Sequence, residues 1–459
     1  MNHEISTIER IITGFSDLAW GTPLLVLLLG GGLFFLIYSR LLPFRHFGHA
    51  IAILRGKYDN PDEPGQINHY QALSTALAAT VGMGNISGVA LAIGLGGPGA
   101  IFWMWISALL GVTTKYFTCT LAVMYRGRDS KGELQGGPMY VIMEGLGKNW
   151  KPLAIFFSLM GMIGVLPMFQ VNQLTQIVRD VVLIPNGVAA GFGTNLASGL
   201  IVSLLVSLVI FGGIKRIGKV TGRMVPIMVV LYVVSVLIII FTQPDRILPS
   251  FALIFHDAFH ANSVMGGALG ALVITGVRRA AFSNEAGIGT APMAHGAAKT
   301  NEPVREGLVA MLGPVVDTII VCTMTALALI ITGVWSNGES DGITLTADAF
   351  ESALPGIGAY LLTLCVFVFS ISTMLSFPYY GTKCYSFVFG ARSSYLYKWF
   401  YIITIPLGAT ATLGTVVGIF DGAYALMAFP TMISALLLSP SVIRASKDYF
   451  QRLKASRNG

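Results

Sequence analysis

A run of glycines interrupts a long apolar segment near residue 80. Three glycines and an asparagine fall within the stretch 80–88, which begins Thr80-Val81-Gly82-Met83-Gly84-Asn85. Each glycine costs about 1 kcal/mol of helix stability relative to alanine. In hydrocarbon, a backbone group freed from a helix is also costly unless a partner satisfies it. Because such breaks are tolerated where they line a cavity, the stretch predicts a binding site.

The chemistry of a broken helix suits a zwitterion. Free N–H groups at a half-helix N-terminus carry partial positive charge and favour a carboxylate. Free carbonyls favour a small cation or an ammonium group. Gly82 and Gly84 let the backbone approach a ligand closely, and the Asn85 amide can donate and accept hydrogen bonds. The alternative is close helix packing through Gly84 and Gly88 alone, which leaves Asn85 unexplained.

A second interruption follows in the apolar segment 264–298, as Phe282-Ser283-Asn284-Glu285-Ala286-Gly287-Ile288-Gly289. This segment is too long for one straight span, since about 20 residues cross a bilayer. It therefore predicts two half-helices around a break. Matching glycine-interrupted helices in two halves of a chain are the best sequence indication of a secondary transporter's site.

Two further groups of polar residues lie inside apolar segments. Ser370, Ser372 and Thr373 are hydroxyls in mid-span. Hard cations prefer oxygen ligands, so the adjacent hydroxyls of Ser372 and Thr373 could bind sodium together with backbone carbonyls. From the residues alone, bonding back to their own helix is slightly favoured, since such bonds are common. Gln170 and Asn172 either line the pocket or bond across helices.

Five charged residues fall within apolar segments, where such residues are functional candidates. They are Lys115, Arg278, Arg279, Glu285 and Asp317. Mutual ion pairing among the five is the simplest expectation. The alternatives are an arginine that binds a substrate carboxylate and an acid that takes part in ion coupling.

The composition is that of an integral membrane protein. Of the 459 residues, 54% are hydrophobic and 11% charged, against about 25% charged in soluble domains. The apolar runs are continuous rather than alternating, which excludes membrane strands. Eleven apolar segments are expected near 18–39, 71–96, 100–125, 153–178, 197–212, 222–243, 264–298, 306–335, 357–378, 397–419 and 423–442.

Charge sets the expected orientation. Most of the 29 basic residues lie in alternate connections and in the C-terminal tail. By the positive-inside rule these connections are cytoplasmic, so the N-terminus is outside and the C-terminus inside. The net charge of +7 then reflects topology and not a nucleic acid partner. The four cysteines show neither metal spacing nor a disulfide pattern.

The expected organisation is a repeat. Residues 1–68 form a peripheral first helix and a cytoplasmic loop. Residues 69–243 and 244–442 form two five-helix repeats of opposite topology, each opened by a broken helix. Residues 443–459 form a basic cytoplasmic tail.

Several motifs together resemble the alanine or glycine:cation symporter family. They are Gln71-Ala72-Leu73 through Gly88, Gly96-Gly97-Pro98-Gly99, Gly136-Gly137-Pro138-Met139-Tyr140, Phe282-Ser283-Asn284-Glu285 and Tyr379-Tyr380-Gly381-Thr382-Lys383. The resemblance implies an all-α membrane protein with the five-plus-five inverted repeat of leucine-transporter-like proteins. It also implies sodium-driven uptake of a small neutral amino acid, glycine or alanine, across a bacterial-type inner membrane.

The same resemblance implies two sets of site residues. Sodium would be bound by the carbonyls of Ala78, Val81 and Phe369 and the hydroxyls of Ser372 and Thr373. The substrate would be bound by Gly82, Met83, Gly84, Asn85, Gln170, Phe282, Asn284 and Phe377. Met83 stands where some relatives carry a hydroxyl, and Phe377 where some carry tryptophan. Both departures affect the expected substrate preference.

Other functions remain as alternatives. Glu285 and Asp317 keep a proton-coupled symporter open, and another neutral amino acid such as glutamine is a second possibility. A channel would need a repeated filter. An enzyme would need a nucleophile with its base or a set of metal ligands, and no such motif is evident, so enzymatic activity is not expected. The sequence does not indicate an oligomeric state.

Overall fold

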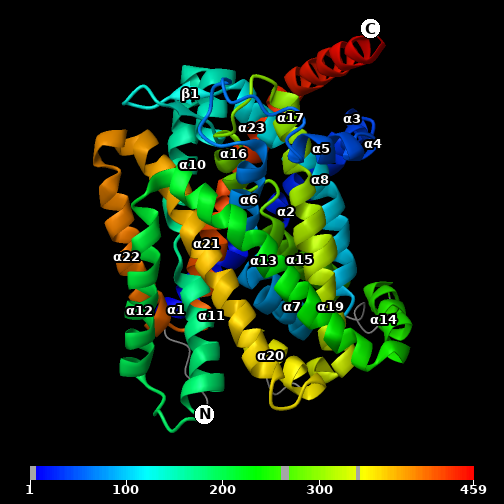
Figure 1. The fold of residues 1–459 in the computed structure, drawn as a ribbon, viewed down its shortest axis with the longest axis vertical. Helices are drawn as coiled ribbons and strands as arrows, with labels where there is room; N and C mark the ends of the chain where they lie inside the picture. Colours follow the sequence, from blue (N-terminus) through cyan, green and yellow to red (C-terminus); the bar gives the residue numbers. More distant parts are fainter. Residues whose placement is uncertain (1–6, 260–267, 337–341, 459) are drawn as a thin grey trace.

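The computed structural model describes residues 7–259, 268–336 and 342–458. These residues are almost entirely helical, apart from one short hairpin of β1 (Gly127–Arg128) and β2 (Leu134–Gln135). Most long helices run along the long axis of the molecule, and the last turns of α23 (Leu413–Asn458) extend beyond the bundle at one end (Figure 1). The protein is a multi-pass α-helical membrane protein.

The expected apolar segments fall on helices, but the boundary expected between the last two was wrong. α22 (Tyr395–Thr410) ends at Thr410 and α23 begins at Leu413, so the segment 397–419 runs past the end of α22 into α23. In the described ranges nine helices are long and apolar enough to span a membrane. Two expected segments are missing from the nine for simple reasons. The segment 264–298 is divided into two shorter helices, and α22 (Tyr395–Thr410) is only 16 residues long. Residues 264–267 of the former lie outside the described residues.

The first break is narrower than the sequence indicates. α6 (His69–Thr80) ends before Val81, and α7 (Met83–Gly96) begins directly after Gly82. Only Val81 and Gly82 leave the helix, and both are extended. Gly84 and Asn85 lie in the first turn of α7, where they were expected within the break itself. The free N–H groups of this turn still face the break.

The second break matches the expectation of two half-helices. α15 (Ala268–Asn284) and α16 (Thr290–His295) are separated by Glu285–Gly289. Glu285 has φ of +56°, and Gly287 and Gly289 have φ of +88° and +109°. Left-handed backbone suits glycine but strains a glutamate. The neighbours of Glu285 must therefore hold it in place.

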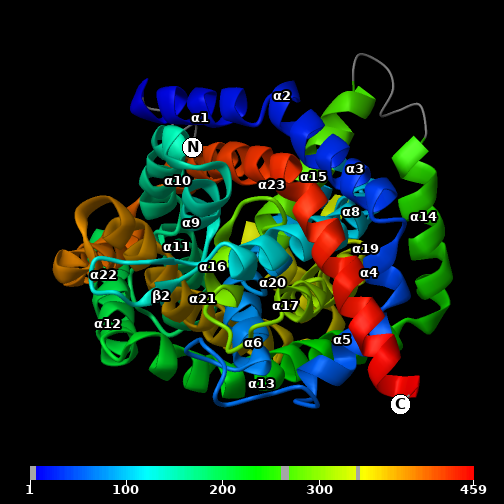
Figure 2. The ribbon, with the colours of Figure 1, turned by 90° about the horizontal axis from the view of Figure 1, so that it is seen from above.

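Helices that flank the two breaks lie near the centre of the bundle, together with the unbroken α21 (Gly358–Phe389) (Figure 2). Seen from above, α6, α16 and α21 are near the centre, whereas α1 (Thr7–Ala19), α12 (Phe192–Ile210) and α13 (Gly213–Thr242) lie at the edge (Figure 2). α7 is almost fully buried. α12 exposes Leu200, Leu204 and Leu208 at helical spacing, as expected of a helix that faces lipid.

The other longer helices are α8 (Ala100–Met124), α10 (Lys151–Gly164), α11 (Met168–Ile177), α14 (Ile247–Phe259), α19 (Thr323–Thr332), α20 (Gly342–Ala353) and α23 (Leu413–Asn458). The shorter ones are α2 (Thr22–Leu25), α3 (Gly31–Tyr38), α4 (Leu42–Arg45), α5 (Phe47–Leu54), α9 (Pro138–Tyr140), α17 (Pro303–Ala310) and α18 (Leu312–Pro314). Turns of π-helix lie at Val26–Gly30, Val141–Leu146, Val178–Leu183 and Val315–Cys322. Turns of 3-10 helix lie at Lys148–Trp150, Pro244–Arg246, Val334–Ser336 and Ala391–Ser393.

Candidate functional site

The first break lies directly against the hydroxyls of α21. A Cβ atom added at Gly82 would lie 2.5 Å from Oγ1 of Thr373. Real side chains do not approach so closely, so glycine is required here for the two elements to meet. The structure therefore brings together two features that are almost 300 positions apart in the sequence.

Four of the five expected sodium ligands are linked by hydrogen bonds. The Ser372 hydroxyl donates to the Phe369 carbonyl at 2.8 Å and reaches the Ala78 carbonyl of α6 at 3.4 Å. The Thr373 hydroxyl donates to the Phe369 carbonyl at 3.2 Å. Val81, the fifth, is buried next to Gly82. Carbonyl and hydroxyl oxygens are the donors that a hard cation prefers. The bonds to Phe369 are also the local bonds that mid-helix hydroxyls often make.

The first break also meets the second one. A Cβ atom at Gly84 would lie 3.1 Å from the Phe282 ring and 3.3 Å from the Cα atom of Ser283. The backbone at the start of α7 therefore packs directly against the Phe282 side chain at the end of α15. The helix that follows the first break thus lies against the helix that precedes the second, and Thr373 of α21 lies against Gly82.

Asp317 joins these two helix ends from a third element. Its carboxylate accepts hydrogen bonds from the Asn85 amide at 2.7 Å, the Ser283 hydroxyl at 2.7 Å and the Thr318 hydroxyl at 2.8 Å. All four residues are buried. The Asn85 oxygen in turn accepts from the Gly82 N–H at 2.9 Å. The polar atoms of Asn85 therefore bind protein groups and position the break.

The second break is fixed by its own side chains. The Asn284 amide donates to the Thr318 hydroxyl at 3.1 Å, and its oxygen accepts from the Ala286 N–H at 2.9 Å. Glu285 accepts hydrogen bonds from the Thr290 hydroxyl and, at 2.8 Å, from the Tyr424 hydroxyl of α23. These contacts hold the strained backbone of Glu285. Asn284, which was expected to bind substrate, has both polar atoms engaged in this structural role.

Aromatic rings form an apolar wall around Phe282. Its ring packs against Phe169 of α11 and Phe420 of α23, with centroids 5.2 Å and 4.9 Å away. Phe420 stacks on Phe377 at 6.2 Å, which places Phe282 and Phe377, both expected to bind substrate, on the same wall. Phe169 was not identified from the sequence because aromatic residues in apolar spans carry no distinguishing pattern, and Phe420 because it falls between two expected spans.

The amides of α11 have separate roles. Asn172 donates to the carbonyls of Gly408 and Ala411 at 3.1 Å and 2.8 Å, so it is a cross-helix contact. Gln170 is buried, and its side-chain oxygen has no hydrogen-bond partner among the described residues. Buried polar atoms normally have partners. Of the two interpretations, Gln170 thus fits the ligand role and Asn172 the structural one.

Opposite outcomes are expected for these two amides. The side-chain oxygen of Gln170 makes no hydrogen bond to the described protein, so Gln170→Leu should leave thermal stability unchanged. The KM for substrate should rise. Asn172→Leu leaves two carbonyls without their donor, at a cost of about 1–3 kcal/mol of folding free energy. Thermal unfolding in detergent and labelled amino acid uptake measure the two effects. A destabilised Gln170 variant with normal KM would contradict the assignment.

The prediction that the five intramembrane charges pair with one another was wrong. Arg278 and Arg279 bind Asp421 of α23, at 3.0 Å and 3.2 Å, and Arg278 also binds Asp17 of α1 at 2.9 Å. Among the described residues, no salt bridge joins Lys115 to Glu285 or Asp317. Asp421 was missed because it falls between two expected spans, 397–419 and 423–442, where a charge is unremarkable.

Other unpartnered polar atoms lie close to the site in sequence. The hydroxyls of Thr80, Ser376 and Tyr380 are buried without hydrogen-bond partners among the described residues. Thr80 ends α6 at the break. Ser376 and Tyr380 follow Ser372 at helical spacing on α21, which is a signal that the sequence did contain.

Comparison with known proteins decides the family. The model of the sodium:alanine symporter family matches residues 5–459. The chain belongs to this family. Sodium/alanine symporter AgcS from Methanococcus maripaludis is 40% identical over 96% of both chains. An uncharacterised transporter from Haemophilus influenzae is 43% identical over 98% of this chain and 97% of its own. The resemblance inferred from the motifs is confirmed.

Two further comparisons define the limits of the family assignment. The probable sodium/glutamine symporter GlnT from Bacillus subtilis is 34% identical over 98% of this chain and 92% of its own. The crystal structure of MhsT in complex with L-phenylalanine matches with a TM-score of 0.56 at 13% identity, over 83% of this chain and 98% of that chain. This likeness shows the fold and confirms the expected leucine-transporter-like architecture. The family comprises amino acid transporters, whose relatives are named for different substrates.

Proposed function

We propose that the protein is a sodium-coupled symporter of a small neutral amino acid, glycine or alanine, that works by alternating access. The observation that carries this proposal is the position of the first break. Gly82 touches Thr373 on one side, and Gly84 touches Phe282 on the other. A cation at the α21 hydroxyls and a substrate beside Phe282 would therefore share one short stretch of backbone.

The proposed binding mode follows from the backbone. The N–H groups at the start of α7 suit the substrate carboxylate, and Gln170 offers an unpartnered oxygen to the ammonium group. The Phe282 ring and the aromatic residues around it would bound the side chain. The tight approach of Phe282 to Gly84 favours a small one. A difference of one methylene is worth about 1–3 kcal/mol, so both glycine and alanine are expected to be accepted.

The proposed orientation places the basic connections in the cytoplasm of a bacterial-type plasma membrane, with the N-terminus outside. The two five-helix repeats, 69–243 and 244–442, would move relative to each other around the site. The AgcS relative is named a sodium/alanine symporter, which supports the choice of ion and substrate class. At 40% identity, substrate preference can differ between the two proteins. Met83 and Phe377 are the residues to vary when the substrate preference of this chain is mapped.

Labelled uptake into proteoliposomes tests the function. We expect an inward sodium gradient to drive accumulation of glycine or alanine, and a pH gradient without sodium to drive none. Accumulation driven by the pH gradient alone would support proton coupling through Glu285 or Asp317 instead. Competition by a panel of unlabelled amino acids, including glutamine, ranks the substrates.

Thr373 variants test the ion site. Thr373→Val keeps the shape but loses the hydroxyl, and Thr373→Ser keeps the hydroxyl. We expect the valine variant to need about tenfold more sodium for half-maximal uptake, since about 1.4 kcal/mol of lost binding is a factor of ten. The serine variant should stay close to wild type. Ser372→Ala combined with Thr373→Ala should weaken sodium dependence further, and unchanged sodium affinity in this pair would place the ion elsewhere.

A further inference from the structure

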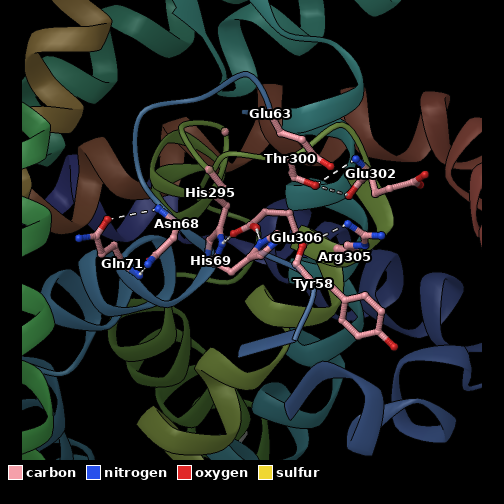
Figure 3. A network of polar contacts seen from close by, with 12 residues as sticks. Tyr58, Glu63, Asn68, His69, Gln71, His295, Thr300, Glu302, Arg305 and Glu306 are labelled. Atoms are coloured by element: carbon pink, nitrogen blue, oxygen red, sulfur yellow. Dashed lines mark hydrogen bonds and ion pairs between the residues drawn. The ribbon is translucent and has the colours of Figure 1, made fainter. Parts of the chain in front are cut away.

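A buried cluster of two histidines and one glutamate lies at the end of the bundle that carries β1 and the C-terminus (Figures 1 and 3). His69 is the first residue of α6, His295 is the last residue of α16, and Glu306 belongs to α17. All three side chains are at most 1% exposed. No part of the proposed sodium or substrate site includes them.

Glu306 bridges the two imidazoles. One carboxylate oxygen contacts Nδ1 of His69, and the other contacts Nδ1 of His295 at 2.5 Å. The Nε2 atoms of both histidines are buried and have no partner among the described residues. His69 begins α6 and His295 ends α16, so a single carboxylate joins the two half-helices at this end of the bundle (Figure 3).

Contacts to the backbone join the segments that surround the cluster at this end of the bundle. Ile67 and Ala298 form an isolated parallel bridge between the segments that flank α6 and α16. Arg126 donates to the carbonyls of Gly296, Ala298 and Thr300, and to Pro64 on the other segment. Opening this end for release would have to separate α6 from α16, and with them the two imidazoles that share Glu306.

The charge of the cluster depends on bound protons. With both imidazoles neutral the ionised cluster carries one negative charge, and with one proton bound it is neutral overall. Burial favours the neutral form, since an uncompensated buried charge is costly. The other charged or titratable groups around the cluster are Asp59, Cys119, Arg126, Arg305 and Lys383. The three cations among these oppose a second proton.

We propose that His69, Glu306 and His295 form a regulatory proton-binding site that holds this end of the transporter closed. A protonated imidazole attracts the Glu306 carboxylate only while the ends of α6 and α16 lie next to each other. The proton therefore binds more tightly to the closed form, and by linkage acid favours closure while rising pH favours opening. A free imidazole changes its charge between about pH 5 and 8, so the pH range of the test is centred there.

A native cysteine reports on the opening. Cys119 of α8 is fully buried and packs against Ala291 of α16 and Ala310 of α17. Separation of α16 from its neighbours would expose it. We design a reporter protein in which Cys322, Cys365 and Cys384 are replaced by alanine. A membrane-impermeant methanethiosulfonate reagent is applied to inside-out and right-side-out vesicles in sodium-free buffer, and the rate of Cys119 modification is measured from pH 5.5 to 8.5.

The test compares Glu306→Gln with the parent reporter at each pH, because the thiol itself reacts faster in alkali. Glutamine keeps the shape but loses the charge. At acid pH the variant should be modified about fivefold faster or more, the low end of ordinary coupling between sites. The ratio should approach one at alkaline pH. Glu302→Gln is the matched control, because Glu302 pairs with Arg452 outside the cluster, and its ratio should stay near one throughout.

A Glu306→Gln ratio that does not change with pH would overturn the proposal. If that variant does not fold, His69→Gln and His295→Gln take its place. Each leaves one imidazole on Glu306, so a smaller ratio that still falls with rising pH is expected, and a flat profile in both overturns the proposal. The inference uses the alternating access of the proposed function. Its readout needs no transport, so a failure of sodium-driven uptake is distinguishable from a failure of the proton site.

Discussion

Replacing Gly82 with alanine is expected to abolish sodium-dependent uptake. The added Cβ atom would lie 2.5 Å from the Thr373 hydroxyl oxygen. Either the Thr373 side chain would have to rotate or the break and α21 would have to move apart, and both changes displace groups that are proposed to bind the ion. Sites for small cations require ligands held within a few tenths of an ångström. A displacement of this size should therefore weaken sodium binding more than any loss of a single hydroxyl.

Gly94→Ala is the matched control for this prediction. It lies on α7, and an added Cβ atom meets nothing within 4 Å. Alanine there should keep uptake and raise helix stability by up to about 1 kcal/mol. Uptake into proteoliposomes as a function of sodium concentration measures both variants. Wild-type sodium dependence in the Gly82 variant would separate the ion from this contact.

Removing Asp421 is expected to destabilise the protein more than any other single charge change. Asp421 is fully buried, and it is the carboxylate that Arg279 binds. Asp421→Ala leaves buried arginine charge without its partner, which typically costs about 3–5 kcal/mol. We expect a clear fall in the thermal unfolding midpoint in detergent, together with loss of uptake.

The exposed partner of the neighbouring Arg278 provides the comparison. Asp17 also binds Arg278, but its side chain is 71% exposed, and exposed pairs contribute about 0–1 kcal/mol. Asp17→Ala should thus leave the unfolding midpoint almost unchanged. Adding Arg279→Met to Asp421→Ala should restore part of the lost stability, since the unpaired charge is then gone. Equal destabilisation by the Asp17 and Asp421 variants would show that burial does not set the strength of this network.

The broken helices could be predicted from the sequence because their signal is local. Glycine and asparagine in the middle of an apolar segment conflict with an unbroken helix, and this conflict is visible without knowing any neighbour. The apolar segment 264–298 was correctly predicted to be two half-helices. The exact width of the first break was not, because Asn85 caps the Gly82 N–H within the first turn of α7 and so extends that helix up to Met83.

Networks built from several elements could not be predicted in this way. The pairing of Arg279 with Asp421 joins residues 142 positions apart, and spacing carries no information about such a contact. The positions of His69, His295 and Glu306 in the sequence likewise give no indication that the fold buries them together. The separate roles of Gln170 and Asn172 also required their neighbours, since both amides have the same chemistry in the sequence.

Asp317 has a consequence for the energetics of binding. Its carboxylate accepts hydrogen bonds from Asn85 at the start of α7 and from Ser283 at the end of α15. The two helix ends are therefore joined by the same side chain. An ion that orders the first break and a substrate that orders the second would then stabilise the same arrangement. Linkage requires the effect to be reciprocal. Sodium should tighten the amino acid by the same factor as the amino acid tightens sodium.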